Sequence, residues 1–304
     1  MNFIRRAFYT KQPYQFSSID RVRESHLVSN IYSNQDHSFN IADIRDPHVL
    51  NVIFRKENPD IVVHFAAESF VDSSIDNAQP FVTSNVVGTQ NIIDACLAAE
   101  VNKLVYISTD EVYGHLTDEN DSPWTEDATL QPRNPYSASK AAGELLVKAA
   151  HETHGLTYQI TRSCNNYGPW QDAEKLIPKI IKNVLLNEPV PIYGQGAQIR
   201  DWIHVHDNCS ALYKIINDGY DNQTYNISSN QEYPNVEVFQ NVCNTLGKGY
   251  DLIKFVDDRL GHDFRYSIDA SKLKGLGWSP EYKFKDGLIQ CCQWYVNNQW
   301  FFRM

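Results

Sequence analysis

Two adjacent carboxylates follow an apolar run of the kind that forms buried β-strands. Residues 103–107 are Lys-Leu-Val-Tyr-Ile, and Ser108, Thr109, Asp110 and Glu111 come directly after them. Polar groups at the carboxyl end of a parallel strand lie where open α/β sheets bind ligands. Two carboxyl groups in one confined site can differ in protonation, so that one acts as an acid and the other as a base. The alternative is the start of a helix, where acidic side chains complement the helix dipole.

A tyrosine and a lysine stand four residues apart where a helix is expected to begin. Pro135 precedes Tyr136-Ser-Ala-Ser-Lys140, and proline is favoured in the first turn of a helix. Residues four apart share one helix face, so a lysine there can stabilise a phenolate. A phenol with a pKa of about 10 serves as a base at neutral pH only if its phenolate gains about 4 kcal/mol. Y-x-x-x-K alone also fits an ordinary amphipathic helix, but the carboxylates upstream favour catalysis.

The elements that would position these groups alternate along the chain. Runs typical of covered parallel strands occupy residues 15–20, 38–43, 60–67, 103–109 and 156–162. Helical stretches at residues 81–99 and 136–154 lie between the later strands. This alternation predicts an α/β fold with a doubly wound, Rossmann-like parallel sheet.

The alternation ends near residue 167, after which proline and glycine become frequent. We therefore expect a Rossmann-like, NAD-binding domain at residues 1–167. A smaller mixed α/β substrate lobe is expected at residues 168–304, interleaved with the last strands of the sheet. Gly194-Gln-Gly196 does not open a helix after a first strand, so we expect a turn between two short strands and not a phosphate loop.

Composition argues against several classes of partner. The net charge is −10, whereas nucleic-acid binding needs a basic surface, although a few local arginines can still hold an anionic substrate. No run of about 18 apolar residues is present, which predicts no membrane span. The six cysteines include no C-x-x-C pair, so we expect free thiols in a reducing, cytoplasmic compartment. We expect no metal site and no targeting peptide.

A series of short segments in fixed order carries a resemblance to a known family. They are residues 64–69, 71–75, 85–89, 108–114, 134–140, 165–169, 174–178, 191–194, 200–202, 225–227, 258–262 and 276–278. In this order they resemble the dTDP-glucose 4,6-dehydratases and their UDP-sugar relatives, which are extended short-chain dehydrogenases. Related epimerases and decarboxylases share Y-x-x-x-K, but most carry Ser at the position of Asp110.

The resemblance implies an internal redox cycle with NAD. Tyr136, backed by Lys140, would remove the proton of the sugar C4 hydroxyl while its C4 hydride passes to NAD. Thr109 would hold the C4 oxygen. The resulting ketone acidifies the C5 proton, which Glu111 would take as base. Asp110, in its protonated form, would donate to the departing C6 hydroxyl as water leaves, and the hydride would return to C6.

The resemblance also implies two sets of binding residues. The cofactor-binding set is Asp20, Asp43, Ile44, Ala66, Ala67, Thr83, Ser108, Tyr136, Lys140 and Asn166. The substrate-binding set is Ser69, Thr109, Asn165, Lys175, Leu176, Lys179, Pro191, Ile192, Tyr193, Arg200, Asn235, Arg259 and His262. Arg200 and Arg259 would neutralise phosphate charge, which suits a bidentate guanidinium, whereas an isolated arginine is more often a surface ion pair. For Asp20, a solvated loop carboxylate is an equal alternative.

The chain departs from the family at its start. The family opens with a strand and G-x-x-G-x-x-G, which lets the backbone approach the NAD pyrophosphate, but the first glycine here is Gly88. Residues 2–8 resemble the helix after that loop. In the strand order 3-2-1-4-5-6 the absent strand is central, so strand edges would stay unpaired unless residues 1–8 or another chain fill the gap. Three explanations would account for the missing loop. They are a misassigned start, which we favour, a truncated product, or a fold adapted to bind the sugar nucleotide without normal NAD catalysis.

The leading hypothesis is a 4,6-dehydratase that converts dTDP-glucose or UDP-glucose to the 4-keto-6-deoxy sugar, in deoxysugar or rhamnose synthesis. The resemblance implies a homodimer formed through the helices at residues 81–99 and 136–154. One alternative is a UDP-sugar epimerase or decarboxylase, which Asp110 and Glu111 argue against. Another is a sugar-nucleotide-binding pseudoenzyme, suggested by the missing glycine loop.

Overall fold

The computed structural model describes residues 15–21 and 37–303. The segment at residues 2–8, expected to form a helix or to fill the gap in the sheet, lies outside the described residues. The chain folds into two compact units. The first unit takes in residues up to Tyr113, then Thr129–Arg162 and Leu212–Tyr225.

The second unit consists of Gly114–Ala128, Ser163–Ala211 and Asn226–Met304. The chain therefore passes between the units several times. The domains predicted at residues 1–167 and 168–304, with the interleaving expected for the second, stay predictions.

Parallel strands form the centre of the first unit. Its four-stranded sheet has the order β3-β4-β5-β9, with β3 at Ile61–His64, β4 at Lys103–Thr109, β5 at Tyr158–Ser163 and β9 at Gln223–Ile227. β3 and β4 pair in parallel, with Ile61 opposite Lys103. β1 (Phe16–Asp20) and β2 (His37–Ile41) form a separate two-stranded parallel sheet.

The strands predicted from the sequence are all present, and the prediction of a Rossmann-like α/β fold is confirmed. Within the described residues, β1 does not pair with β3, and the strands fall into two sheets.

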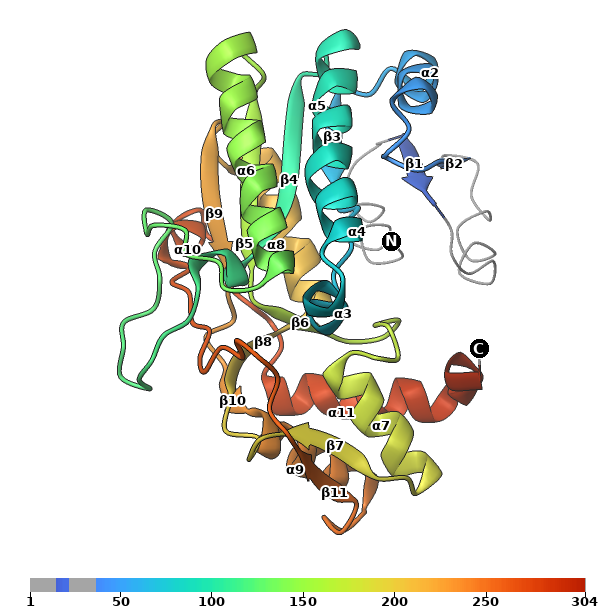
Figure 1. Cartoon of the computed structure of the whole chain (residues 1–304), viewed down its shortest axis with the longest axis vertical. Coiled ribbons are helices and arrows are strands. Elements are labelled where there is room, and N and C mark those ends of the chain that lie inside the picture. Colours follow the sequence, from blue (N-terminus) through green and yellow to red (C-terminus); the bar gives the residue numbers. More distant parts are fainter. Residues whose placement is uncertain (1–14, 22–36, 304) are drawn as a thin grey trace. The chain divides into compact units, whose positions relative to one another are not determined.

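Helices of the first unit cover this sheet. They are α2 (Pro47–Glu57), α3 (Val71–Asp76), α4 (Gln79–Phe81), η2 (Val82–Val87), α5 (Gly88–Ala98), η3 (Asp110–Tyr113) and α6 (Pro135–His154). α5 and α6 lie side by side, and α6 contacts β4 (Figure 1). The apolar core between these elements includes the fully buried Ile93, Leu104, Val147 and Ile160. Burial of such side chains stabilises the unit by roughly 1.5–3 kcal/mol each.

Local sequence explains where α6 begins and how closely it packs. Asn134 caps the helix by accepting from the Ser137 backbone N–H, and the Ser137 side chain completes a capping box. The helix ends at Gly155, which has a φ of 72°. At Gly143 an added Cβ would lie 2.1 Å from the Tyr106 hydroxyl, so glycine lets α6 approach β4. The predicted helix at residues 136–154 is confirmed.

The predicted helix at residues 81–99 is confirmed with one difference. Its first part, η2, is a π-helix, which then continues as α5. Within this stretch the Thr83 hydroxyl donates to the carbonyls of Gln79 and Pro80. Wide π turns inside longer helices are frequent at functional sites.

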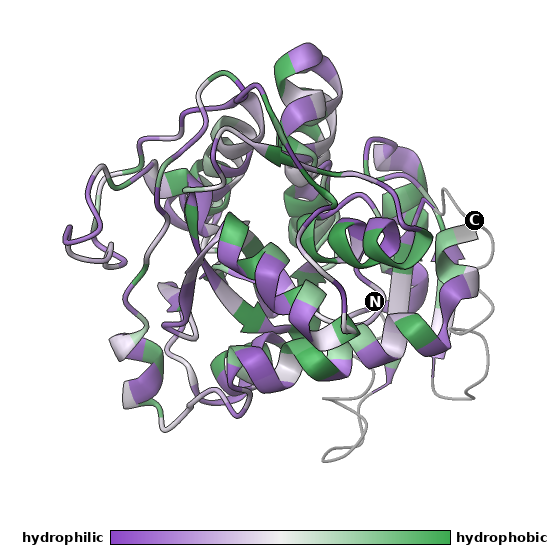
Figure 2. Cartoon of the chain, turned by 90° about the horizontal axis from the view of Figure 1, so that it is seen from below, coloured by the Kyte–Doolittle hydropathy of each residue, from purple (hydrophilic) through white to green (hydrophobic). Residues whose placement is uncertain are grey.

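The second unit is a smaller mixture of strands and helices. Its strands are β6 (Asn165–Tyr167), β7 (Val190–Tyr193), β8 (Ile199–His204), β10 (Glu232–Pro234) and β11 (Ile253–Val256), which form the sheets β10-β8-β6 and β11-β7. Its helices are α7 (Leu176–Leu186), α9 (Asn235–Leu246), α10 (Ser271–Gly275), α11 (Phe284–Asn297) and η4 (Gln299–Arg303), while α8 (Val205–Asp218) passes between the units. The helices carry hydrophobic and hydrophilic bands (Figure 2), and their apolar sides form a core around Ile180, Phe239 and Cys291.

The turn expected at Gly194-Gln-Gly196 connects β7 to β8, and both glycines have positive φ. None of the six cysteines, all of which lie in the described residues, forms a disulfide. Within the described ranges, no helix is long and apolar enough to span a membrane. Residues 15–21 and 37–303 also contain no group of His, Cys, Asp or Glu side chains suited to a metal ion.

Candidate active site

The carboxyl end of β4 carries three polar side chains into η3. Thr109 and Asp110 are both buried, with 8% and 4% of their surface exposed. The Thr109 hydroxyl lies 3.2 Å from Asp110 Oδ1, and the Glu111 backbone N–H donates to the Thr109 hydroxyl at 3.3 Å. Asp110 and Glu111 therefore do begin a short 3-10 helix. The burial of Asp110 goes beyond what a favourable interaction with a helix dipole requires.

α6 brings Tyr136 to the same place. The Tyr136 backbone N–H donates to the Ser74 hydroxyl at 3.2 Å, and its ring meets Phe81 edge-on at 6.4 Å. Burial and the charges of Glu111 and Asp110 raise the pKa of Tyr136 above its usual value, while a hydrogen bond with Thr109 lowers it. The phenol therefore interacts with the threonine and both carboxylates, and their catalytic roles stay a prediction.

Lys140 lies on the same helix but is directed at the sheet. Its Nζ donates to the Ile107 carbonyl at 2.6 Å and lies 4.3 Å from the centre of the Tyr106 ring. Only 3% of its surface is exposed. Burial lowers the pKa of Lys140 to about 7, although the nearby Glu144 carboxylate raises it. Burial therefore weakens the protonated form of this amine in the ligand-free protein.

Asn134 links the two elements of the site. Its side-chain oxygen caps α6, and its side-chain nitrogen donates to Glu111 Oε2 at 3.3 Å. The residue belongs to a motif segment but was not predicted as a site residue. Its place directly before Pro135 and Tyr136 was the available signal, since asparagine is a preferred helix cap.

A second asparagine fixes the loop that follows β3. The Asn85 side chain donates to the Glu68 carbonyl and to the Ser139 hydroxyl, each at 2.9 Å, and accepts from the Glu68 N–H at 2.8 Å. Three predicted ligand-binding residues lie in or beside this loop, namely Ala66, Ala67 and Ser69. The loop stands at the carboxyl end of β3, where open α/β sheets bind ligands.

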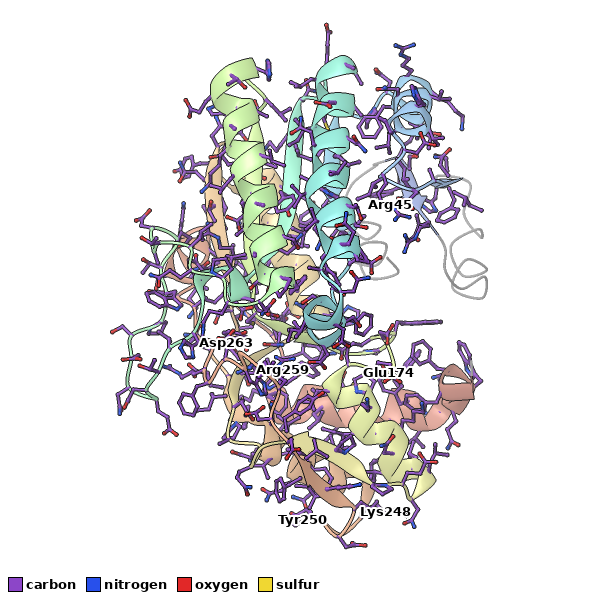
Figure 3. The ribbon with its side chains drawn as sticks, viewed as in Figure 1. Arg45, Glu174, Lys248, Tyr250, Arg259 and Asp263 are labelled. Atoms are coloured by element: carbon purple, nitrogen blue, oxygen red, sulfur yellow. The ribbon has the colours of Figure 1, made fainter. Side chains whose placement is uncertain are left out.

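The residues predicted near the adenosine of NAD follow β1 and β2. Asp20 is the last residue of β1. The Asp43 carboxylate accepts from Arg45 at 2.9 and 2.6 Å and pairs with Arg21 at 3.4 Å, and the Arg45 hydrogen bond is the main cause that lowers the pKa of Asp43. Figure 3 labels Arg45 beside this sheet. Ile44 is buried in the core against Gly88, so its side chain serves packing.

Predicted ligand-binding residues carry buried polar atoms that make no hydrogen bond with any residue in the described parts of the chain. They are Ser108 Oγ, Asn165 Oδ1, Asn166 Oδ1 and Asn235 Oδ1. An unsatisfied buried polar atom costs roughly 1–3 kcal/mol, so each is suited to a ligand that supplies its partner. Ser108 belongs to the first unit and the asparagines belong to the second.

Sequence reasoning missed two glutamines of the second unit with the same property, Gln171 and Gln198, whose Oε1 atoms are buried without a partner in the described residues. Gln198 Nε2 donates to Asp258 at 2.8 Å, which leaves its Oε1 as an oriented acceptor. Asp258 also hydrogen-bonds His262. Burial and the charge of Arg259 lower the pKa of His262 to about 4, so this imidazole is neutral at pH 7.

The Arg200 side chain is hydrogen-bonded to backbone carbonyls of the protein. Its guanidinium donates to the carbonyls of Ile199, Asp263 and Phe264 at 2.7, 2.9 and 3.2 Å, and lies 4.2 Å from the Tyr266 ring centre. It therefore fixes the segment that follows His262, and a phosphate contact of Arg200 stays a prediction.

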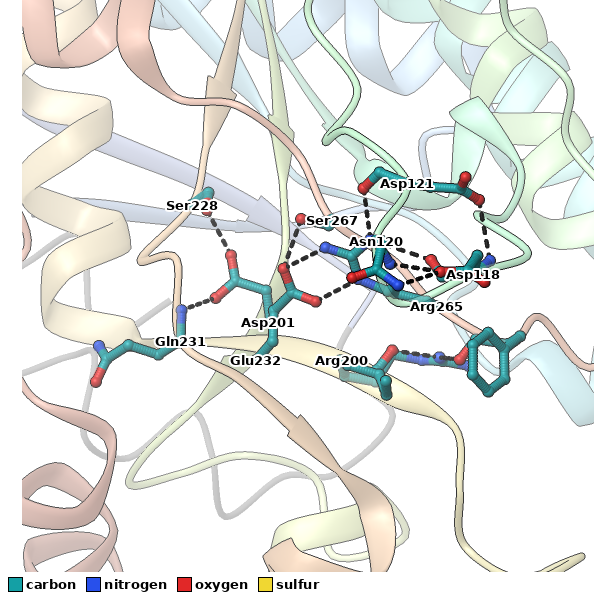
Figure 4. A network of polar contacts seen from close by, with 12 residues as sticks. Asp118, Asn120, Asp121, Arg200, Asp201, Ser228, Gln231, Glu232, Arg265 and Ser267 are labelled. Atoms are coloured by element: carbon teal, nitrogen blue, oxygen red, sulfur yellow. Dashed lines mark hydrogen bonds and ion pairs between the residues drawn. The ribbon is translucent and has the colours of Figure 1, made fainter.

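Polar contacts around Arg200 fix the strands of the second unit. Arg265 donates to Glu232 at 2.6 and 2.9 Å and to the Asp121 carbonyl at 2.7 Å, and Asp201 accepts from the Ser228 hydroxyl and the Gln231 N–H (Figure 4). These bonds tie the segment Gly114–Ala128 to β10.

Other predicted substrate-binding residues lie on β7 and α7 or next to them. Tyr193 is partly exposed and meets His262 edge-on at 5.8 Å, whereas Ile192 is buried in the core. Lys175 precedes α7, and Lys179 pairs with the exposed Glu174 at 3.0 Å. The two units each carry part of the predicted binding residues.

Comparison with known proteins identifies the family. The model of the GDP-mannose 4,6-dehydratase family matches residues 7–291. The chain belongs to this family. The resemblance found in the sequence is thereby confirmed, whereas the roles that it implies for the residues at β4 and α6 stay predictions.

Individual relatives are similar to this dehydratase over most of its length. The low-salt glycan biosynthesis protein Agl12 of Haloferax volcanii is 48% identical, with 89% of this chain and 86% of that protein covered. The dTDP-glucose 4,6-dehydratase of Haemophilus influenzae is 44% identical, with the same coverage. The crystal structure of DesIV, a dTDP-glucose 4,6-dehydratase from Streptomyces venezuelae with NAD bound, has a TM-score of 0.93 at 37% identity, covering 98% of this chain and 94% of that one.

Proposed function

We propose that this dehydratase converts dTDP-glucose to the 4-keto-6-deoxy sugar nucleotide, with NAD as an internal redox partner. The observation that carries the proposal is the convergence of Tyr136, Thr109, Asp110 and Glu111 at the end of β4. Relatives from 40% to 44% identical are named dTDP-glucose 4,6-dehydratases, which favours dTDP-glucose over UDP-glucose.

In the first step, Tyr136 accepts the proton of the C4 hydroxyl. Thr109, which is hydrogen-bonded to Tyr136, holds the C4 oxygen. Bound NAD supplies the hydride acceptor and a positive charge. Because burial and two carboxylates oppose the Tyr136 phenolate, positive charge from Lys140 and the cofactor is needed to lower its pKa toward neutrality.

The second step removes water. The C4 ketone acidifies the C5 proton, and Glu111, oriented by Asn134 at 3.3 Å, takes it as base. Asp110 donates its proton to the C6 hydroxyl as the C6–O bond breaks, so that water departs. The hydride removed from C4 then returns to C6 and a proton from Glu111 returns to C5, which gives the 4-keto-6-deoxy sugar. This role requires the protonated form of Asp110, whose side chain is buried beside Thr109.

The remaining predicted residues would hold the ligands. Bound NAD would satisfy the buried hydroxyl of Ser108, with its adenosine beside Asp20 and Asp43, and it would contact Ala66, Ala67, Thr83 and Asn166. The sugar nucleotide would contact Ser69, Asn165, Lys175, Leu176 and Lys179. Its nucleotide would lie against Pro191, Ile192 and Tyr193, with Arg200, Asn235, Arg259 and His262 around the phosphates and base.

The test is product analysis. The purified protein is incubated with NAD and either dTDP-glucose or UDP-glucose, and the sugar nucleotides are identified by NMR. We expect the 4-keto-6-deoxy product from dTDP-glucose, its loss in Glu111→Gln, and normal turnover in Glu152→Gln, an exposed control on α6. Epimerised or decarboxylated sugar, or a Glu111→Gln variant as active as wild type, would refute the proposal.

A protein that binds the sugar nucleotide without catalysis is the second candidate. Calorimetry separates the candidates. Binding of dTDP-glucose without any heat of NAD binding supports the pseudoenzyme, whereas binding of both ligands supports the dehydratase.

We also propose a cytoplasmic homodimer formed through η2, α5 and α6. These helices expose the apolar side chains of Val82, Val87 and Leu145, with 44%, 48% and 60% of their surface accessible. Apolar side chains gathered on neighbouring helices are typical of subunit interfaces. Leu145→Lys should shift the mass measured by light scattering from dimer to monomer, and an unchanged mass would argue against this interface.

A further inference from the structure

A buried arginine joins the two elements that carry the catalytic groups. Arg162 lies on β5 with 1% of its side chain exposed, and its partner Glu144 has none exposed. Arg162 Nε lies 3.1 and 3.2 Å from the two Glu144 oxygens, and NH2 lies 2.6 Å from Oε2. NH1 donates to the Tyr113 hydroxyl at 2.6 Å. We call Arg162, Glu144 and Tyr113 the Arg162 cluster.

The members of the Arg162 cluster stand next to catalytic residues on different elements. Glu144 follows Lys140 by one turn of α6, the helix that also carries Tyr136. Tyr113 ends η3, the single turn that carries both catalytic carboxylates. One planar guanidinium on the central sheet thus holds the end of η3 and the middle of α6 at the same time.

The chemistry of the Arg162 cluster suits positioning more than stability. A buried ion pair is often no more stabilising than apolar side chains of equal volume, because both charges lose their hydration. Its advantage is geometric, since the fork of an arginine fixes two parallel hydrogen bonds in one plane. The guanidinium carbon also lies 4.6 Å from the Tyr113 ring centre, so the orientation of the ring is fixed as well as its hydroxyl.

We propose that Arg162 is a positioning residue, which sets η3 against α6 so that the acid, the base and the phenol meet one sugar ring. The inference rests on the proposed dehydratase function. Elimination requires Asp110 and Glu111 to be correctly positioned around the sugar ring. Tyr136 and Thr109 hold that ring in place. A misplacement of about 1 Å lowers turnover by about 100-fold, whereas sugar-nucleotide binding, which depends on many other residues, is retained.

The test removes one hydroxyl from the Arg162 cluster. Tyr113→Phe is compared with Tyr225→Phe, a matched control in which another fully buried tyrosine of the first unit loses a hydroxyl that accepts from the Tyr220 N–H at 2.7 Å. Arg162→Lys is the second variant, because an ammonium keeps the charge but cannot donate in one plane to both partners. The measurements are kcat, the Kd for dTDP-glucose by calorimetry and the melting temperature.

For Tyr113→Phe and Arg162→Lys we expect kcat to fall by about 10-fold to 100-fold, with Kd within about twofold of the Tyr225→Phe value. The exchange of the C5 proton of the 4-keto-6-deoxy product in D2O, which reports on Glu111 directly, should slow by a similar factor. A kcat equal to that of Tyr225→Phe overturns the inference. The inference is also overturned if a lower melting temperature or a weaker Kd accounts for the loss of kcat.

Amide hydrogen exchange makes the inference independent of turnover. If wild type forms no product, the proposed function fails, but the positioning role is still decided by the peptide that covers η3. Faster exchange there in Tyr113→Phe than in Tyr225→Phe supports the inference. Equal exchange rates in both variants overturn it.

Discussion

The pH dependence of stability should reveal the buried amine of Lys140. We consider Lys140→Met in the ligand-free protein, because methionine fills a similar volume without charge. The amine is 3% exposed and its pKa falls from 10.5 to about 7, mainly because burial removes its hydration. Between these two pH values the unfolded chain binds one proton that the folded protein does not.

The sign and size of the pH effect on the free energy of unfolding follow from the difference in proton binding between the folded and unfolded states. Stability rises with pH wherever the unfolded state binds more protons, by about 1.4 kcal/mol per pH unit for one group. Lys140 therefore weakens the fold most below pH 7, and the deficit disappears as the pH rises toward 10.5. The whole window is worth about 5 kcal/mol, and the interval from pH 7 to 9 is worth about 2.7 kcal/mol. Lys140→Met removes this slope.

The assay is urea unfolding at several pH values between 6 and 9. The free energy of unfolding of Lys140→Met minus that of wild type should fall by about 2–3 kcal/mol from pH 7 to 9. The lost hydrogen bond to the Ile107 carbonyl shifts this difference by a constant, so its slope is the diagnostic quantity. Lys56→Met, at an exposed lysine, is the control. Parallel curves for wild type and Lys140→Met would refute the desolvation argument.

Three further variants test other parts of the site. Arg162→Met should lower the free energy of unfolding by about 3–5 kcal/mol, because Glu144 is left buried and unpaired; a loss below about 1 kcal/mol in urea unfolding would contradict this. Ser108→Ala should stabilise the ligand-free protein by up to about 1 kcal/mol, because a buried hydroxyl is removed, yet weaken NAD binding in calorimetry; unchanged NAD affinity would exclude a contact. Asn134→Ala should cost about 1 kcal/mol as a lost helix cap and lower kcat beyond what the melting temperature explains; unaltered kcat would exclude a role in orienting Glu111.

Local sequence was enough to predict the elements that carry the catalytic groups. A β-branched run followed by Thr109, Asp110 and Glu111 predicts a strand end, and β4 ends at Thr109. Pro135 after a capping asparagine predicts the start of α6. These signals are local because strand pattern, proline geometry and capping act within a few residues.

The contacts that fix the site could not be predicted in this way. Arg162 lies 18 residues from Glu144 and 49 from Tyr113 along the chain, and no periodicity relates them. The spacing of Tyr136 and Lys140 predicted a shared helix face, but the bond from Lys140 to the Ile107 carbonyl depends on how α6 packs on β4. The π turn of η2 has the same apolar pattern as an α-helix.

In the proposed mechanism, the same charged groups affect both chemical steps. The carboxylates that we propose for the elimination are also charges that raise the pKa of Tyr136, so the groups proposed for one step oppose the other. Lys140 alone does not resolve this conflict, because burial lowers its pKa and so weakens its own protonated form. A protonated Asp110 lessens the negative charge near the phenol, and a bound cationic nicotinamide adds positive charge. Proton removal from the C4 hydroxyl is therefore tied to the protonation that water loss needs, and the placement of η3 against α6 bears on both.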